Sequence, residues 1–139
     1  DMYPKGGNML HTIRNIINDD TKWISILHGL QSDFWHQTVT TQQIESYITN
    51  KAGIDLSKVF DQYLRTTKIP LLKYKVNGKS VTFNYDRVVS GFAMPIRVNI
   101  NGKEMKITPT EAPQTLDLPE EIKTFVVNRN FYIDSEKSN

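Results

Sequence analysis

Hydrophobic side chains recur at helical spacing along the first half of the chain. Met9, Leu10, Ile13, Ile16 and Ile17 recur three and four positions apart, so a helix would carry them on one face. Pro4 suits the first turn of that helix, because the backbone N–H that proline lacks has no partner there. Three further segments show the same spacing, and their apolar residues are Trp23, Leu27, Leu30 and Phe34, then Ile44 and Ile48, then Leu56, Val59, Phe60, Tyr63 and Leu64.

Polar residues mark the ends of these segments. Thr40 followed by Gln43 has the spacing of a capping box, in which each side chain bonds the backbone N–H of the other residue. Gly53 is suited to end that helix and Asp55 to begin the next one. The pattern predicts an N-terminal helical bundle segment of about four helices, which closes at Pro70.

The spacing of apolar residues changes after Pro70, where they alternate with polar ones as in a half-buried strand. Asn77-Gly78 and Asn101-Gly102 are typical of the type I′ turns that join two antiparallel strands. We therefore expect two hairpins, each with one apolar face. Two-residue turns at these places predict Tyr74 opposite Val81, Leu72 opposite Phe83, Val98 opposite Met105 and Ile96 opposite Ile107.

Shorter strands are expected near the C-terminus, around residues 115–118, 123–127 and 131–133, between prolines that interrupt pairing. Residues 135–139 are polar and are interpreted as a tail. The second half is therefore predicted to be a small antiparallel β-sandwich. Together with the helices before it, this gives an α+β fold class.

Composition and charge exclude several classes of partner and chemistry. The 139 residues carry 17 Lys+Arg and 15 Asp+Glu, and a net charge of +2 gives no reason to expect nucleic acid or an acidic membrane surface as partner. No apolar run approaches the ~20 residues of a membrane span, so none is expected in this segment. The absence of cysteine excludes disulfides and thiolate chemistry. The chain begins with Asp, which we interpret as a piece of a longer protein, and its localisation stays unknown.

Side chains that could catalyse a reaction do not form a set at a recognisable spacing. His11, His28 and His36 are the nitrogen ligands available to zinc, and His28 and His36 would lie ~12 Å apart along one helix. No serine stands in a Gly-x-Ser-x-Gly elbow, and no glycine-rich phosphate loop follows a strand. The residue chemistry alone therefore indicates a binding or structural module.

One segment carries more information than its composition. Residues 3–14, Tyr-Pro-Lys-Gly-Gly-Asn-Met-Leu-His-Thr-Ile-Arg, resemble the Tyr-x-Lys-Gly motif and the Met/Leu-rich helix after it in the aminopeptidase N family of gluzincin zinc metallopeptidases. Further segments are similar to motifs of that family in the same order, at residues 20–23, 40–45, 56–64, 69–72 and 92–96. Two positions depart from the family pattern, with Gln43 in place of an acid and Tyr63 in place of a tryptophan.

The resemblance implies that residues 1–70 are the C-terminal helical part of a thermolysin-like catalytic domain and that residues 71–139 are the β-sandwich domain after it. The family's His-Glu-x-x-His helix and distal zinc-binding Glu precede the tyrosine motif, and this sequence contains neither of them, nor the Gly-x-Met-Glu-Asn-type strand. The resemblance thus implies zinc in the parent protein and none in this fragment. The parent would remove N-terminal residues from peptides, and the fragment is expected to be inactive alone.

Tyr3 is the residue to which the resemblance gives a catalytic role. Its phenol, which stays protonated at neutral pH with a pKa of ~10, would donate a hydrogen bond to the oxyanion of the transition state in the parent. A position at a helix N-terminus adds the favourable end of the helix dipole. No metal-binding or cofactor-binding residue is expected in this chain.

The resemblance also implies partners. The parent would bind a peptide substrate, and this chain would pack on the missing zinc-binding part. The helix faces that packed there would be exposed, which makes them candidates for an apolar surface or for self-association. These candidates are Met2, Tyr3 and parts of the Met9/Ile13 and Trp23/Leu27 stripes.

Two alternatives to the peptidase interpretation stay open. One is a free-standing helical and β-sandwich interaction module, whose site would be an exposed strand edge or a loop cluster. The other is a non-peptidase relative that keeps the family fold without the zinc motif.

Overall fold

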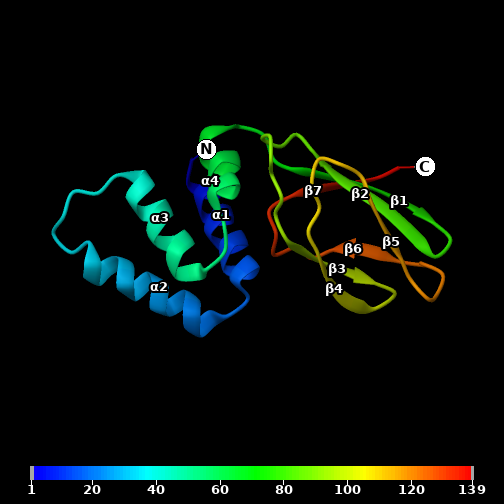
Figure 1. Cartoon of the computed structure of the whole chain (residues 1–139), viewed down its shortest axis with the longest axis horizontal. Coiled ribbons are helices and arrows are strands. Elements are labelled where there is room, and N and C mark those ends of the chain that lie inside the picture. The colour runs from blue at the N-terminus through cyan, green and yellow to red at the C-terminus, as the bar shows by residue number, and fades with distance from the viewer. Residues whose placement is uncertain (1, 139) are drawn as a thin grey trace.

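The computed structural model describes residues 2–138, with side chains over residues 6–138. Four helices come first and seven strands follow within these residues, which confirms the α+β class (Figure 1). The helices are α1 (Met2–Ile17), α2 (Asp20–Asp33), α3 (Thr41–Ala52) and α4 (Ser57–Arg65), and the strands are β1 (Leu71–Asn77), β2 (Ser80–Asp86), β3 (Ile96–Ile100), β4 (Lys103–Ile107), β5 (Gln114–Asp117), β6 (Phe125–Val127) and β7 (Asp134–Lys137).

The ends of α3 follow the capping residues that the sequence shows. The Thr40 hydroxyl accepts from the Gln43 N–H at 3.2 Å, and the Gln43 side chain accepts from the Thr40 N–H at 2.8 Å, which confirms the capping box. Gly53 ends the helix at φ +71°, in the left-handed region that glycine adopts without a steric penalty. Asp55 accepts from the Ser57 N–H at 3.0 Å where α4 begins.

The strands form two sheets, with the orders β5-β2-β1-β7 and β4-β3-β6 among the described residues. Antiparallel pairing dominates both sheets as predicted, and the exception among the described strands is β7, which pairs with β1 in parallel. The predicted strand at 131–133 and the tail at 135–139 are wrong, because the strand is Asp134–Lys137. All four residues of β7 are polar and exposed, so its pairing depends on backbone bonds that a hydrophobic pattern cannot reveal.

The two hairpins differ in how well the sequence predicts their register. In the second, Asn101 and Gly102 have φ of +53° and +84°, and the predicted pairs Val98–Met105 and Ile96–Ile107 are confirmed. In the first, the predicted pairs are wrong, because Tyr74 pairs with Phe83 and Leu72 with Tyr85. Asn77 belongs to β1, and the turn is formed by Gly78, at φ +63°, and the residue after it. Glycine at the first turn position is typical of a type II′ turn, which closes the hairpin just as tightly as type I′.

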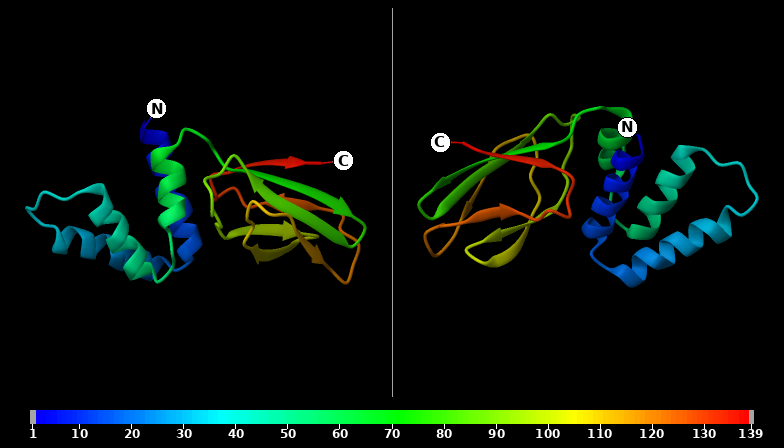
Figure 2. Two further views of the ribbon diagram at one scale, coloured as in Figure 1. Left: turned by 45° about the horizontal axis from the view of Figure 1, so that its top comes forward. Right: turned by 180° about the vertical axis from the view of Figure 1, so that it is seen from behind.

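The helices and the sheets share one hydrophobic core. Figure 2 shows α1 and α4 between the sheets and the α2–α3 hairpin. Ile13 of α1, Tyr63 of α4 and Tyr85 of β2 are almost completely buried in the same cluster. The division into domains at residue 70 stays a prediction, although helix gives way to strand between Arg65 and Leu71.

A fully buried glutamine joins the helices to the strands. The Gln62 amide donates to the carbonyls of Lys68 and Arg87, both at 2.9 Å, and its oxygen accepts from the Val89 N–H at 2.8 Å. These partners come from the connection after α4 and from the loop after β2. A buried backbone group that loses its partner costs ~1–3 kcal/mol, so Gln62 fixes how these segments meet.

We therefore predict that Gln62→Glu lowers the free energy of unfolding by about 3 kcal/mol at pH 7, because a carboxylate oxygen would face two carbonyls. Burial and these carbonyls would raise the pKa of the new carboxyl above ~4.3. A protonated carboxyl can still donate one bond, so the loss is smallest below pH ~4 and grows as pH rises through the raised pKa.

Urea unfolding at several pH values between 4 and 8 measures this effect. Gln42→Glu is the matched control, since Gln42 is exposed on α3 and the same chemical change there leaves stability almost unchanged. A loss of stability that is equal at every pH would contradict the assigned donors and acceptor of Gln62.

Candidate functional site

Tyr3 lies in the first turn of α1, but its side chain lies outside the described part of the structure, as does that of Met2. Its position shares one helical row with Gly7, Leu10 and Arg14, because these residues follow at steps of four, three and four. All three of them are exposed, and Leu10 is 40 % exposed. The catalytic role of Tyr3 stays a prediction.

The opposite face of α1 is fixed to the β part by polar contacts. The buried Thr12 hydroxyl donates to the Asn8 carbonyl at 2.7 Å and accepts from the Tyr132 N–H at 2.9 Å. His11 Nε2 lies 3.1 Å from Asn130 Oδ1 in the same loop. Arg97 of β3 donates to the Asn15 side chain at 2.8 Å. The helix that carries Tyr3 is therefore held in a fixed orientation from its middle to its C-terminus.

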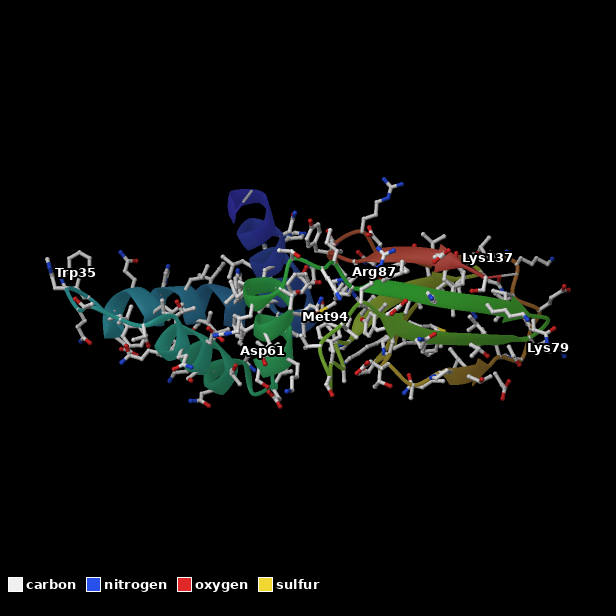
Figure 3. All side chains as sticks on the ribbon, turned by 90° about the horizontal axis from the view of Figure 1, so that it is seen from above. Trp35, Asp61, Lys79, Arg87, Met94 and Lys137 are labelled. Carbon is white, nitrogen blue, oxygen red and sulfur yellow. The ribbon has the colours of Figure 1, made fainter. Side chains whose placement is uncertain are left out.

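The N-terminal turns of α1 have few neighbours. In Figure 3 they project beyond the other helices, on the same side of the molecule as β7. Gly6 and Gly7 lie in this part, and a Cβ atom on either would have no heavy atom within 4 Å. Glycine inside a helix costs ~0.5–1 kcal/mol relative to alanine, and no described residue provides a steric reason for it here.

The exposed row of α1 continues onto α2 across an ion pair. Arg14 Nε lies 2.8 Å from Asp20 Oδ1 and Arg14 Nη2 lies 2.9 Å from Asp20 Oδ2. The hydrogen bond and the opposite charge raise the pKa of Arg14, and the Arg14 hydrogen bond lowers the pKa of Asp20. Ile24 and Leu27 follow on α2 and are 50 % and 42 % exposed. We call Leu10, Arg14, Asp20, Ile24 and Leu27 the outer face.

The stripes that the sequence nominated as exposed are exposed only in part. Met9, Ile13 and Trp23 are buried within the chain, and Leu27 is the part of these stripes that is exposed. Leu10, which the spacing places on the same face as Met9, is exposed instead of buried. Helical spacing identifies a stripe but not its partner, and α1 and α2 use these residues to pack on α4 and α3. The apolar groups left on the surface are the neighbours of those stripes, Leu10 and Ile24.

The three histidines do not meet. His11 contacts Asn130, His28 is on α2, and His36 follows that helix at φ +57°. Within the described residues no three His, Asp or Glu side chains gather as metal ligands. No helix in the same range is long and apolar enough to cross a membrane.

Sequence reasoning missed a groove beside α1. It has a volume of about 440 Å³, and Asn8 and His11 of α1 line it. The other lining residues come from β6, from the loop that follows β6, from Ser135 of β7 and from Tyr74 of β1. The groove lies between elements that are far apart in the sequence. To predict it, one would need to know that β7 pairs with β1, which the sequence pattern does not reveal.

Two buried tyrosines outside the groove are structural. The Tyr63 hydroxyl donates to the Tyr132 carbonyl at 2.5 Å, and the Tyr85 hydroxyl donates to the Met94 carbonyl at 2.8 Å. Burial raises the pKa of both phenols far above the ordinary value. Each phenol therefore stays protonated and acts as a donor to the backbone.

Among solved structures, the chain is similar to the crystal structure of Legionella pneumophila aminopeptidase A in complex with aspartic acid, with a TM-score of 0.71 and 16 % sequence identity. The match covers 99 % of this chain but 18 % of that protein, so the chain spans less than a fifth of its length. At this identity the likeness shows the fold, which is similar to a segment of an aminopeptidase. No protein-family model matches the sequence, and no curated protein matches it either.

The open space around Gly6 and Gly7 can be tested through the stability of residues 1–139 alone. We predict that Gly6→Ala and Gly7→Ala each raise the free energy of unfolding by about 0.5–1 kcal/mol, because alanine reduces the entropy of the unfolded state and meets no neighbour. Thermal or urea unfolding measures the change. Gly53→Ala, at φ +71°, is the contrasting control and is expected to lower stability by about 1 kcal/mol. Destabilisation by both α1 substitutions would mean that another part of this chain packs there.

Proposed function

We propose that this chain is part of a zinc-dependent aminopeptidase of the aminopeptidase N family. Residues 1–70 would be the C-terminal helices of its thermolysin-like catalytic domain, and residues 71–139 the β-sandwich domain that follows. The observation that carries the proposal is the likeness of 99 % of the chain to a segment of an aminopeptidase, obtained independently of the motifs. The order of the family-like motifs, from residues 3–14 to residues 92–96, supports the finer assignment.

The reaction proposed for the whole protein is hydrolysis of the first peptide bond of a peptide. Zinc would supply the Lewis acid that activates water, and its ligands would lie outside this chain, since the described residues form no metal-binding set. Tyr3 would donate its phenolic proton in a hydrogen bond to the oxygen that becomes negative in the tetrahedral intermediate. Its place at the N-terminus of α1 adds the positive end of the helix dipole.

The outer face would be covered by the zinc-binding part of the same polypeptide. Leu10, Ile24 and Leu27 are exposed apolar side chains on neighbouring rows of α1 and α2. Removing their surface from water would be favourable through the hydrophobic effect. The Arg14–Asp20 pair lies between them, and its mutual hydrogen bonds would offset part of the desolvation cost of covering both charges. Gly6 and Gly7 would allow a backbone to approach α1 closely beside Tyr3.

We predict that Tyr3→Phe, made in a polypeptide extended upstream to include the zinc ligands, lowers kcat by about 10²–10³ and changes KM little. The reason is that the phenol would bind the transition state and not the ground state. Steady-state hydrolysis of an aminoacyl-anilide measures both constants, and zinc content is measured in the same preparations.

Tyr47→Phe is the matched control, because Tyr47 lies on α3 and packs against Phe34, away from α1. It should leave kcat within about twofold. A zinc-loaded extended protein without hydrolysis would contradict the proposal and favour a non-peptidase relative. Hydrolysis by residues 1–139 alone would contradict the placement of the zinc site outside this chain.

A further inference from the structure

One edge strand of the two sheets lacks the features that usually prevent pairing with another chain. Free edges are normally protected by charged side chains or by proline. Among the strands described, β4 carries Lys103, Glu104 and Lys106, β7 carries Asp134, Glu136 and Lys137, and β5 lies between Pro113 and Pro119. By contrast, β6 is Phe-Val-Val, and Val126 is 56 % exposed.

The backbone groups of β6 that make no bond to β3 belong to residues that line the groove beside α1. The Asn128 N–H donates to the Arg97 carbonyl at 3.0 Å, and the Asn101 N–H donates to the Thr124 carbonyl at 3.2 Å. In an antiparallel pair the bonded residues alternate, so Phe125 and Val127 direct their N–H and C=O groups away from β3. Phe125 and Val127 both line the groove.

The groove has the size and shape for an added strand. Three residues of extended peptide span ~10 Å, which matches the three residues of β6. The Tyr74 and Phe125 rings, 4.4 Å apart, give an apolar surface inside the groove, and Asn8 and Ser135 give polar groups at its rim. Its volume of about 440 Å³ lies within the range of sites that bind small ligands.

The charges around the groove favour an anionic occupant. Arg129 lines it, and no Asp or Glu is among its described lining residues. Asp134 and Glu136 alternate with Ser135 on β7, so their side chains point to the opposite face of that strand. A carboxylate of the occupant would meet the guanidinium of Arg129 without a competing acid in the groove.

We propose that this groove binds an extended acidic peptide, which adds to β6 as a further strand and places a carboxylate near Arg129. The groove begins at Asn8, five residues after Tyr3, which is ~8 Å along the helix axis. A peptide bound in the groove would therefore contact α1, the helix that also carries the candidate catalytic residue Tyr3. That this peptide is the substrate rests on the proposed function, whereas binding itself does not.

The test uses residues 1–139 and a fluorescent heptapeptide of alternating valine and glutamate, with binding followed by fluorescence polarisation. We expect Val127→Pro to weaken binding about tenfold, because proline removes the N–H aimed at the peptide and adds a ring there. That N–H makes no bond to β3, so proline is tolerated as on other strand edges. Lys106→Pro is the matched control, since Lys106 has the equivalent place on β4, at the other edge of the sheet, and should bind as the unchanged protein does.

A second pair of variants tests the charge without touching the backbone. Arg129 is exposed, and Arg129→Glu should weaken binding of the valine–glutamate peptide about tenfold and strengthen binding of a valine–lysine peptide. Lys123→Glu, also exposed but outside this groove, should change neither. Strand addition would be overturned if a peptide N-methylated at alternate residues bound as tightly as the unmodified peptide. It would also be overturned if Val127→Pro and Lys106→Pro weakened binding equally.

The outcome is separable from that of the proposed function. Absence of binding at millimolar peptide would overturn this inference, even if the extended protein hydrolyses the anilide. Binding that needs the β6 edge and Arg129 would support it, even if the extended protein proves inactive. Neither zinc nor cleavage enters the binding measurement.

Discussion

The arrangement of this molecule depends on a buried polar seam between its helices and its sheets. Gln62 satisfies three backbone groups from two loops, and Thr12 and Tyr63 satisfy two more in the segment around Tyr132. An apolar contact tolerates sliding, but a buried donor tolerates few positions because an unmade bond costs ~1–3 kcal/mol. The seam therefore fixes α1 and α4 relative to β1, β2 and the loop before β7. Everything that lies across the seam, the groove included, takes its shape from these few bonds.

This constraint explains why the candidate site is rigid on one side and open on the other. From Asn8 onward α1 contacts the β part through Thr12, His11 and Asn15, whereas Gly6 and Gly7 have open space around them. A site that must orient one reacting group benefits from such a support, because the scaffold then supplies the orientation. The same support forms one end of the groove along β6, so peptide binding there and chemistry at the start of α1 would share one rigid element.

The sequence predicted elements whose signal is local and failed where the signal is not. Thr40 with Gln43, Gly53 and Asn101-Gly102 each act on their immediate neighbours, and the structure has all of them in the expected roles. The register at Asn77 was missed because the same dipeptide is compatible with a turn one residue later. Strand β7 and Gln62 were missed because their partners are 63 positions and up to 27 positions away along the chain. The groove combines several such distant partners, so its residues could not be selected from the sequence, and Tyr3 was nominated through a motif.

Some residues of α1 and α2 are unfavourable where they stand, and no contact among the described residues explains them. Gly29 in α2 has a steric reason, since a Cβ there would collide with the Tyr47 hydroxyl. Gly6 and Gly7 in α1 have none, although each weakens its helix. Leu10 and Ile24 are likewise exposed on otherwise well-packed helices. Gly7 and Leu10 share one row of α1, Gly6 directly precedes them, and Ile24 lies on the adjoining part of α2. These features would have a physical cause if a further backbone packs closely against that surface.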